Sequence, residues 1–550
     1  MRKSLFAAVA GLAATAASAT PPIMGPPPPA PPPRLLIVIS VDQLSSDLFE
    51  EYRPMLMGGL GRMARGTVFR NGYQAHAATE TCPGHSTVLT GAHPARNGII
   101  ANGWIDQSLA RANKSVYCAE DVRIAPPEGA TLRYTVSPAH LRVRTLGEMM
   151  KAGRPESRHV AVAGKDRAAV MMSGRIVDQR WFWDGRQFST DLASAPVPAS
   201  VTAANAAIAA ALAASVEPLE PPSICAAKAR PIPTQPGGPT VGAGRFGRAA
   251  GDSRAFRASP ELDGATLAVA AALINELGLG TDTTPDVLAI GLAATDYVGH
   301  SFGTNGSEMC LQMFALDREL GDFFAQLDRQ GLDYAVALTS DHGGQDIPER
   351  LREQGMPDAS RAEAILSATE MGKRLGRELG LQGPVLLGDV GGDVYVDRSL
   401  SAANRARALA SAAAAYRAHP QVEAVLTREQ LAAMPIPTGP VDRWSLAERA
   451  RASFDAERSG DLVVLFRRMV TPIPRPGPGY VATHGTPWDH DRRVPIIFWR
   501  PGMAPADRPE AVATVDIMPT LAAMLGLGRI ADPIDGKCLK GIVGIACPLR

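Results

Sequence analysis

Several features that would assign the chain to a particular class of protein are missing from its sequence. The 550 residues carry a formal net charge of +1, so overall charge gives no reason to expect a nucleic acid or another polyanion as a partner. The six cysteines include no Cys-x-x-Cys pair, which argues against a thiolate zinc finger. No stretch beyond the N-terminus reaches the roughly 18 apolar residues of a membrane span, so we expect no stable membrane insertion. The length allows one large α/β domain with insertions, or about two to three domains.

The N-terminus has the features of a secretory signal peptide. Arg2 and Lys3 precede the apolar run LFAAVAGLAATAA, and residues 17–19 (ASA) form a small-residue cleavage site. We therefore expect a signal peptide at residues 1–19 and a Pro-rich linker at residues 20–33. A membrane anchor is the alternative interpretation of the same run. Export would make the protein secreted or periplasmic.

An oxidising compartment allows disulfide bonds. Cys538 and Cys547 lie close together in the sequence, so we expect them to pair. Cys118 with Cys225 is the second expectation, although sequence alone does not fix the connectivity.

Five short apolar runs end in polar or acidic residues, the pattern of buried strands in a parallel sheet. They are RLLIVISVDQ, HVAVAGKDR, DVLAIGLAATD, DYAVALTSDHGG and VPIIFW. Helical segments such as LAVAAALINELG and MFALDRELGDFFAQLDRQG lie between them. This alternation predicts an α/β fold with a doubly wound, mostly parallel central sheet flanked by helices, whose ligands bind at the carboxyl ends of the strands. We expect residues 34–550 to form one such domain, with cap regions inserted at about 103–255 and 347–474.

Carboxylate and imidazole groups follow these runs. Asp296 and His300 are four residues apart, a spacing that places both on one face of a helical turn, where they could chelate one metal ion. Asp341 and His342 are adjacent and are followed by two glycines that permit an irregular loop. Mixed nitrogen and oxygen donors suit zinc better than calcium or magnesium, and two zinc ions can act on the attacking and leaving oxygens of a phosphoryl transfer. The six candidate ligands are Asp42, Asp296, His300, Asp341, His342 and His484.

The alternative for these residues is structural, because an aspartate after a strand commonly caps a helix and a loop histidine is commonly solvated. We assign such a structural or solvated role to the seven other histidines, and we expect His85 to cap or orient the Thr81 loop. The seven are His76, His85, His93, His140, His159, His419 and His490.

The stretch ATETCPGHSTVLTG, residues 78–91, contains the candidate nucleophile. Pro83 suits the first position of a helix, which places Thr81 just before the helix, facing its unpaired N–H groups. Those groups favour a phosphate, and a hydroxyl there could be activated by a metal ion. Cys82 is the rival nucleophile, although we expect it to pack inward. A helix-capping role for Thr81 is the alternative.

Taken in order, VISVDQ, TETCPGHSTVLTG, NGIIANGW, GKDR, TDYVGH, SDHGG and THGTPWDHDRRVPIIF resemble motifs of the alkaline phosphatase superfamily. They look like those of its nucleotide pyrophosphatase/phosphodiesterase-related branch, and specifically of its secreted bacterial alkaline phosphatases with a threonine nucleophile, the PafA and PhoK type. With VDIMPTLAAMLG the motifs extend from about residue 35 to 525.

This resemblance implies a role for each matching residue. Thr81 would be the nucleophile and would pass through a phosphothreonine intermediate. One zinc ion, next to Thr81, would be held by Asp42, Asp341 and His342, and the second by Asp296, His300 and His484. Asn102 would donate a hydrogen bond to a phosphate oxygen, and Lys165 and Arg167 would bind the additional negative charge of a monoester.

The sequence thus predicts a zinc-dependent alkaline phosphatase that hydrolyses small phosphate monoesters of broad range. A phosphodiesterase or nucleotide pyrophosphatase on the same scaffold is the first alternative, and a metal-storing or surface-binding module is the second. A sulfatase is excluded because Pro83 directly follows Cys82, so the Cys/Ser-x-Pro-x-Arg pattern is absent. The acidic stretch GDVGGDVYVD is a candidate for an additional Ca2+ ion, although it is not an EF-hand loop.

Overall fold

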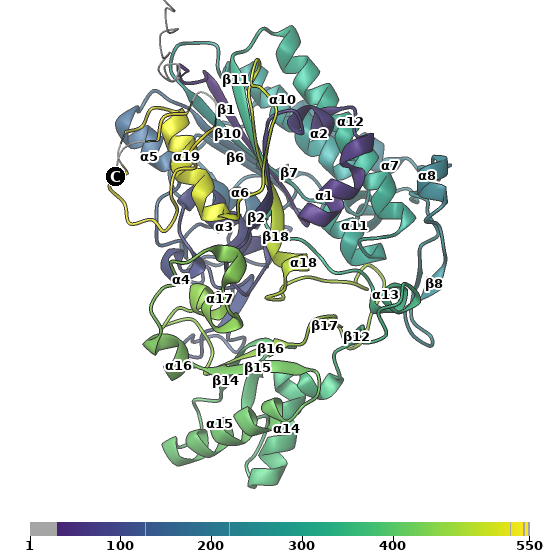
Figure 1. The fold of residues 1–550 in the computed structure, drawn as a ribbon, viewed down its shortest axis with the longest axis vertical. Coiled ribbons are helices and arrows are strands. Elements are labelled where there is room, and N and C mark those ends of the chain that lie inside the picture. The colour runs from purple at the N-terminus through teal and green to yellow at the C-terminus, as the bar shows by residue number, and fades with distance from the viewer. Residues whose placement is uncertain (1–29, 127, 219, 529, 543–544, 548–550) are drawn as a thin grey trace, which may run out of the picture.

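A ten-stranded sheet runs through the larger part of the molecule (Figure 1). The structure is a computed structural model that describes residues 30–126, 128–218, 220–528, 530–542 and 545–547. The expected signal peptide and most of the expected linker lie outside these residues. The strands follow one another across the sheet as β19 (Ala506–Arg508), β2 (Thr67–Tyr73), β18 (Arg493–Trp499), β11 (Tyr334–Thr339), β1 (Leu35–Val41), β10 (Asp286–Leu292), β5 (His159–Ala163), β6 (Gln179–Trp183) and β7 (Phe188–Ser189), and β20 (Val512–Ala513) pairs with β2.

The centre of this sheet is parallel, as predicted. β1 pairs in parallel with both β10 and β11, and β10 pairs in parallel with β5. All five apolar runs form strands of the sheet. The expectation of a parallel strand is wrong for VPIIFW, because β18 is antiparallel to both β11 and β2. The residues before β18 therefore lie at the edge where β1, β10 and β11 end.

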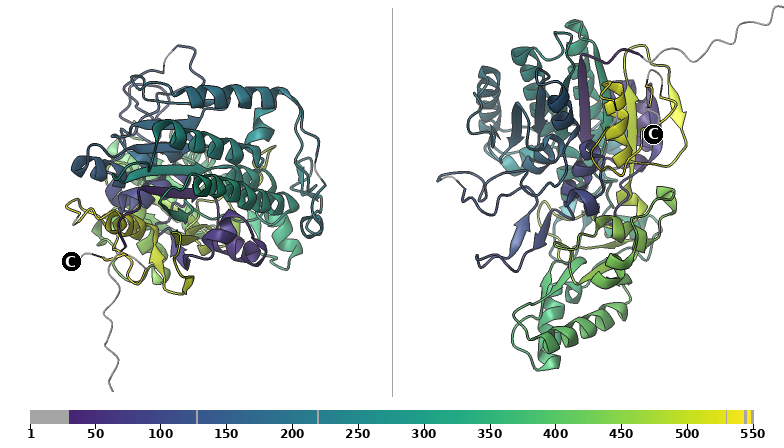
Figure 2. Two further views of the ribbon diagram at one scale, coloured as in Figure 1. Left: turned by 90° about the horizontal axis from the view of Figure 1, so that it is seen from above. Right: turned by 90° about the vertical axis from the view of Figure 1, so that its left-hand side faces the viewer.

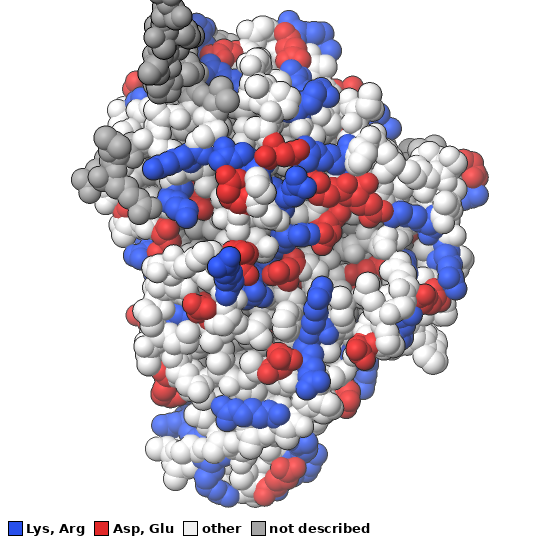
Figure 3. Space-filling model, viewed as in Figure 1, with Lys and Arg blue, Asp and Glu red and all other residues white. Residues whose placement is uncertain are grey.

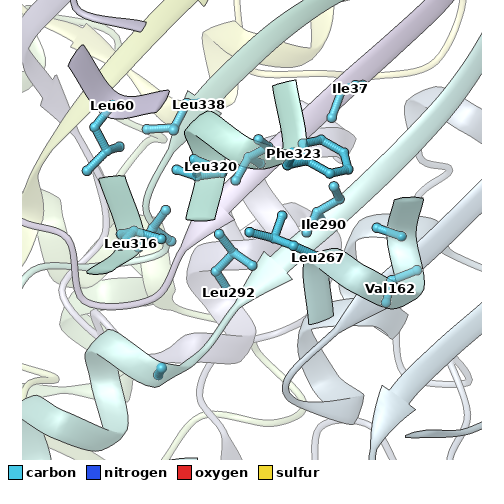
Figure 4. Packing of buried hydrophobic residues seen from close by; sticks show 14 of the residues in the cluster. Ile37, Leu60, Val162, Leu267, Ile290, Leu292, Leu316, Leu320, Phe323 and Leu338 are labelled. Atoms are coloured by element: carbon cyan, nitrogen blue, oxygen red, sulfur yellow. The ribbon is translucent and has the colours of Figure 1, made fainter. Parts of the chain in front are cut away.

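Helices cover both faces of the sheet (Figures 1 and 2). Alternate residues of β1 point to opposite faces, so Ile37 and Ile39 belong to one apolar cluster and Leu36 and Val38 to the other. Figure 4 shows the first cluster, in which Ile37 of β1 lies among side chains from helices of that face. The first face packs against α1 (Ser46–Tyr52), α2 (Gly59–Met63), α7 (Ala199–Ala213), α10 (Glu261–Leu277), α11 (Ala294–Phe302) and α12 (Ser307–Arg329), and the second against α3 (Thr81–Thr90), α5 (Leu146–Gly153), α6 (Asp166–Ser173) and α19 (Ile517–Met524).

A smaller lobe lies beside one end of the central sheet, at the bottom of Figure 1. Its antiparallel four-stranded sheet has its own apolar cluster, which includes Leu375, Val394 and Tyr416. Two helices pack against this sheet, and we call the sheet and these helices the smaller lobe. It comprises β13 (Leu386–Gly388), β14 (Gly392–Val396), β16 (Leu462–Phe466) and β15 (Val422–Thr427), with α14 (Ala368–Leu379) and α15 (Ala402–Arg417).

The two expected insertions differ in their relation to the central sheet. The smaller lobe lies within residues 347–474, whereas residues 103–255 include β5, β6 and β7 of the central sheet itself. Only the parts of 103–255 on either side of these strands lie outside that sheet. The bounds of the cap regions stay a prediction.

Shorter elements connect these layers. The helices are α4 (Pro94–Asn97), α8 (Ser223–Ala226), α9 (Ser253–Arg257), α13 (Pro348–Glu353), α16 (Arg428–Ala433), α17 (Leu446–Ser453) and α18 (Asp489–Arg492), with 3-10 turns at Arg53–Met55, Ala364–Leu366, Val441–Arg443 and Thr514–Asp516. The strand pairs are β3 (Gly103–Ile105) with β4 (Ser115–Tyr117), β8 (Ile232–Pro233) with β9 (Thr240–Val241), and β12 (Ser360–Arg361) with β17 (Val470–Thr471).

The structure pairs all six cysteines. Cys538–Cys547 confirms the first expectation. The pairing of Cys118 with Cys225 is wrong, because Cys118 bonds to Cys82 and Cys225 bonds to Cys310. The fold brings the end of β4 to the start of α3 and α8 to α12, two approaches between distant segments that spacing along the chain does not reveal.

Lysine and arginine side chains are interspersed with aspartate and glutamate over the face shown in Figure 3. Among the helices that the structure describes, none combines the length and apolar character needed to cross a membrane.

Candidate active site

Polar side chains from separate segments meet at the carboxyl edge of the central sheet. Asp42 follows β1, Asp296 lies in the first turn of α11 after β10, and Asp341 follows β11. Because β1 pairs in parallel with both other strands, the three strand ends adjoin one another. All three carboxylates are buried.

Asp296, His300 and His484 form one group of potential metal ligands. The Nε2 atoms of His300 and His484 lie 3.3 Å and 3.5 Å from Oδ1 of Asp296. Each ring uses its Nδ1 atom for a backbone carbonyl, that of Ala482 at 2.7 Å and that of Thr79 at 2.8 Å. These bonds orient both rings so that Nε2 points at Asp296, the arrangement usual for metal-binding histidines.

The electrostatics of this group favour the protonation states that bind metal. Burial lowers the pKa of His300 against the opposing effect of Asp296, and burial lowers the pKa of His484 further. Burial alone would raise the pKa of Asp296, but His300 and Lys165 beside it hold that pKa well below its usual range. The lowered pKa values of the two histidines favour neutral imidazoles, and the lowered pKa of Asp296 favours its charged form.

Asp42, His85 and Asp341 form a second group. His85 Nε2 lies 3.3 Å from Oδ1 of Asp42, and its Nδ1 lies 3.3 Å from Oδ2 of Asp341 and 2.9 Å from the carbonyl oxygen of Thr81. Sequence reasoning assigned His85 a structural role and did not place it in this group of potential metal ligands. Its position four residues after Thr81, one helical turn along α3, was the available signal.

His342 lies next to this second group. Its Nε2 atom is 3.2 Å from Oδ2 of Asp341, and its Nδ1 atom lies 2.8 Å from the carbonyl oxygen of Gly343. The ring stacks on that of His484 with centroids 3.5 Å apart, so the two groups adjoin.

The potential ligand atoms of the second group and of the adjoining His342 fit a bound cation. Asp42 Oδ1, His85 Nε2, Asp341 Oδ2 and His342 Nε2 are buried and have no hydrogen bond to any residue that the structure describes. Their contacts are ion pairs at 3.2–3.3 Å. Buried polar atoms are almost always hydrogen-bonded, so four potential metal-ligand atoms without a hydrogen bond, gathered at one point, favour a bound metal ion.

Thr81 is the first residue of α3, so the helix begins two residues earlier than the Pro83 start predicted from the sequence. Pro83 still falls in the first turn, where its missing N–H removes no helical hydrogen bond. The N–H of Cys82 donates to Oδ1 of Asn102 over 2.8 Å, and the N–H of Asn102 donates to Glu80 over 2.6 Å. These bonds hold Asn102 against the start of α3.

The two predicted phosphate-binding cations contact different groups of this centre. Lys165, just before α6, places its Nζ atom 2.5 Å from Oδ2 of Asp296 and 2.9 Å from Oδ2 of Asp42. Arg167 Nη2 instead donates to Oγ1 of Thr81 over 3.5 Å. The structure thus gathers every predicted site residue at one place, with Lys165 bridging carboxylates of both donor groups.

A cavity of about 1170 Å³ opens over the site. Asn102, Arg167, His300 and His484 line it on the side of the central sheet, and the smaller lobe lines the opposite side with residues such as Tyr395. The volume is large enough to admit an organic group attached to a phosphate.

The acidic stretch proposed for Ca2+ lies in and around β14. Within the described part of the chain, the groups of three or more potential metal ligands are the two given above, and neither includes Asp389, Asp393 or Asp397.

Comparison with known proteins gives consistent matches over almost the whole chain. The sequence pattern of the family described as type I phosphodiesterase / nucleotide pyrophosphatase matches residues 36–488. The chain is 50% identical to alkaline phosphatase PhoK of Sphingomonas sp. over 92% of this chain and 90% of that protein. It is 44% identical to alkaline phosphatase PhoD of Zymomonas mobilis subsp. mobilis over 93% and 89% of the two chains. The crystal structure of wild-type alkaline phosphatase PafA superposes with a TM-score of 0.78 at 25% identity, covering 90% of this chain and 96% of that one.

Proposed function

We propose that this chain, which belongs to the type I phosphodiesterase / nucleotide pyrophosphatase family, is a zinc-dependent alkaline phosphatase that hydrolyses phosphate monoesters of broad range. The relatives named alkaline phosphatase at 50% and 44% identity support this activity. The observation that carries the proposal is the position of Thr81, which begins a helix beside a guanidinium and next to two groups of potential metal ligands.

Thr81 is the nucleophile in this proposal. Its Oγ1 atom would form a bond to phosphorus as the bond from phosphorus to the leaving oxygen breaks, which gives phosphothreonine and the free alcohol. Water would then attack the same phosphorus, break the bond to Oγ1 and release inorganic phosphate. The backbone N–H groups at the start of α3 and the NH2 group of Asn102 would donate to phosphate oxygens, and the amide oxygen of Asn102 already accepts from the N–H of Cys82, which supports this role for the NH2 group. Alkaline pH favours both attacks because it favours the deprotonated nucleophiles.

Two zinc ions fit the donor sets. Asp42, Asp341 and His342, together with Thr81, would hold one ion, and Asp296, His300 and His484 would hold the other. When bound, they would supply positive charge to stabilise the attacking and leaving oxygens. Two observations support this assignment. Several buried ligand atoms have no hydrogen bond among the described residues, and the rings of His300 and His484 are held by Nδ1 bonds to backbone carbonyls, which leaves Nε2 for the ion.

Lys165 and Arg167 would select monoesters. A monoester at alkaline pH carries about one more negative charge than a diester, and two nearby cations favour that additional charge. The contact of Arg167 with Thr81 supports this role, since phosphorus must come within bonding distance of Oγ1.

The test compares kcat/KM for p-nitrophenyl phosphate and bis-p-nitrophenyl phosphate with the zinc-loaded enzyme. We expect the monoester to be preferred, and we expect Lys165→Ala with Arg167→Ala to lower the monoester value strongly and the diester value little. A preference for the diester would instead establish the alternative, a phosphodiesterase or nucleotide pyrophosphatase on this scaffold.

A second measurement addresses the nucleophile. Mass spectrometry after an acid quench should find phosphate on Thr81, and Thr81→Ala should abolish monoester hydrolysis. Zinc binding without turnover in the unaltered chain would leave only a metal-storing or surface-binding module.

We also propose that the protein is secreted or periplasmic. The three disulfide bonds support an oxidising compartment. N-terminal sequencing of the exported protein should find a start at Thr20, and retention of residues 1–19 in a membrane fraction would contradict the signal peptide.

A further inference from the structure

The guanidinium of Arg167 has partners on both of its sides, and each partner precedes a cysteine of the same disulfide. Nη2 donates to Oγ1 of Thr81 over 3.5 Å, and Nη1 donates to the hydroxyl of Tyr117 over 3.4 Å. Thr81 directly precedes Cys82 and Tyr117 directly precedes Cys118, and these two cysteines are bonded to each other. The disulfide therefore spans the two groups between which Arg167 is held.

The hydroxyl of Tyr117 is oriented toward Arg167 by an acidic neighbour. It donates its single proton to Oδ1 of Asp166 over 2.9 Å, which leaves its oxygen lone pairs for the guanidinium. The other oxygen of Asp166 accepts from the hydroxyl of Tyr134 over 2.8 Å. Asp166 is buried, so the two tyrosines satisfy a carboxylate that lies out of water.

The same two-stranded ribbon also places Asn102. β3 and β4 pair with Gly103 opposite Tyr117, and the N–H of Cys118 donates to the carbonyl oxygen of Asn102 over 3.0 Å. Asn102 in turn accepts from the N–H of Cys82. The amide of Asn102 and the guanidinium of Arg167 are the two groups proposed to bind phosphate oxygens near the start of α3. Both therefore depend on the position of the β3–β4 ribbon.

We propose that the β3–β4 ribbon positions the monoester-selecting cation: Tyr117, fixed by Asp166, holds Arg167 against Thr81, and the Cys82–Cys118 disulfide keeps the ribbon aligned with the nucleophile. This inference rests on the proposed function, since it assigns Tyr117 and the disulfide to the selectivity attributed to Arg167. Tyr117 is a positioning residue, because it acts through Arg167.

The experiment measures kcat/KM of the full, zinc-loaded enzyme for p-nitrophenyl phosphate and bis-p-nitrophenyl phosphate. We expect Tyr117→Phe to lower the monoester value about 10-fold, the effect of losing one hydrogen bond to a charged group, and to change the diester value less than about 2-fold. Tyr416→Phe, which removes a buried hydroxyl from the smaller lobe, is the matched control and should leave the ratio of the two values unchanged. Equal losses on both substrates would overturn the proposal.

A double-mutant cycle separates positioning from general damage to the fold. In the Arg167→Ala background, Tyr117→Phe should add less than about 2-fold, because the residue it positions is gone. A full 10-fold loss in that background would overturn the proposal. If Arg167→Ala alone leaves the monoester-to-diester ratio unchanged, the proposed function of the cations fails as well. If it lowers the ratio while Tyr117→Phe does not, only the positioning role fails.

The disulfide has its own matched pair of variants. Cys82→Ser with Cys118→Ser should lower the monoester-to-diester ratio about 5- to 10-fold, because the ribbon loses its bond to the start of α3. Cys225→Ser with Cys310→Ser removes a disulfide between α8 and α12, and it should leave the ratio unchanged. A lower ratio in both double variants, or in neither, would refute the role of the ribbon disulfide.

Discussion

Nζ of Lys165 lies 2.5 Å from Oδ2 of Asp296, the carboxylate whose other oxygen faces His300 and His484. The same ammonium is 2.9 Å from Asp42, so it contacts one carboxylate from each donor group. The carboxylates hold the pKa of Lys165 above its usual value although burial opposes this. A metal ion that binds at either group must therefore compete with, or be repelled by, this positive charge.

Lys165→Ala should accordingly bind zinc more tightly while hydrolysing monoesters more slowly. Removing the ammonium frees both carboxylates, and we expect roughly 10-fold tighter zinc binding in competition with a chromogenic chelator. Lys151→Ala, which removes an ammonium paired with Asp178 elsewhere, is the control and should leave zinc affinity unchanged. Weaker zinc binding in Lys165→Ala would contradict the competition.

His85→Asn should weaken zinc binding at the second group. The His85 ring contacts both Asp42 and Asp341 and also anchors the carbonyl of Thr81. Loss of such an anchoring group typically costs about 10- to 100-fold in metal affinity, which the same chelator competition would measure.

His419→Asn is the control for His85→Asn. The half-buried His419 contacts Glu363 away from the site. His419→Asn should retain zinc as the unaltered chain does. If His85→Asn binds zinc as tightly as the unaltered chain, His85 contributes only to packing.

Gly84→Ala should disrupt the site through close packing of α3. A Cβ atom at this position would lie 2.1 Å from the carbonyl oxygen of Asp341, so backbone must shift to admit it. The shift would separate Thr81 from the ends of the strands, and a displacement near 1 Å lowers catalysis about 100-fold. Gly153→Ala in α5, where a Cβ meets nothing within 4 Å, should leave kcat/KM for p-nitrophenyl phosphate unchanged. Full activity in Gly84→Ala would mean that this contact does not set the geometry.

Glu319→Gln should stabilise the fold at alkaline pH only. Burial, aided by Asp263, raises the pKa of Glu319 to about 8, and its Oε2 atom has no hydrogen bond within the described residues. As pH rises above the ordinary glutamate pKa, the unfolded chain loses this proton while the folded chain keeps it, so stability falls until about pH 8 and then levels off.

Urea unfolding at pH 4 and pH 9 checks the sign of this effect. Glu319→Gln should be neutral at pH 4 and add about 1–3 kcal/mol at pH 9, less than the full pKa shift implies because 19% of the side chain is exposed. Glu378 is exposed, so Glu378→Gln should change the free energy of unfolding by the same amount at both pH values. Stabilisation by Glu319→Gln at pH 4 would refute the linkage.

The sequence predicted those parts of the site that depend on topology. Asp42, Asp296 and Asp341 each follow a strand, and parallel pairing alone brings the ends of such strands together. His484 was predicted from its motif, but the reason it reaches this edge is the antiparallel direction of β18. Strand direction depends on connections between distant segments and not on the apolar pattern within one run.

His85 and the two misassigned cysteines were missed for a related reason. His85 reaches Asp42 and Asp341 because α3 packs against the backbone of Asp341. This contact requires Gly84, and no local sequence pattern predicts it. The partner of Cys118 is the cysteine next to Thr81, 36 residues earlier in the chain, because β4 returns to the start of α3. Both depend on where distant elements meet.

The rings of His342 and His484 stack at 3.5 Å, yet the smaller lobe occupies the stretch of chain between them. The chain thus departs from the central sheet and rejoins it at nearly the same point, the arrangement in which inserted domains are tolerated. The lobe is consequently free to lengthen, shorten or exchange its lining during evolution while the separation of the two histidines stays constant. Divergence there would alter which alcohols are released, and the reaction at phosphorus would be inherited unchanged.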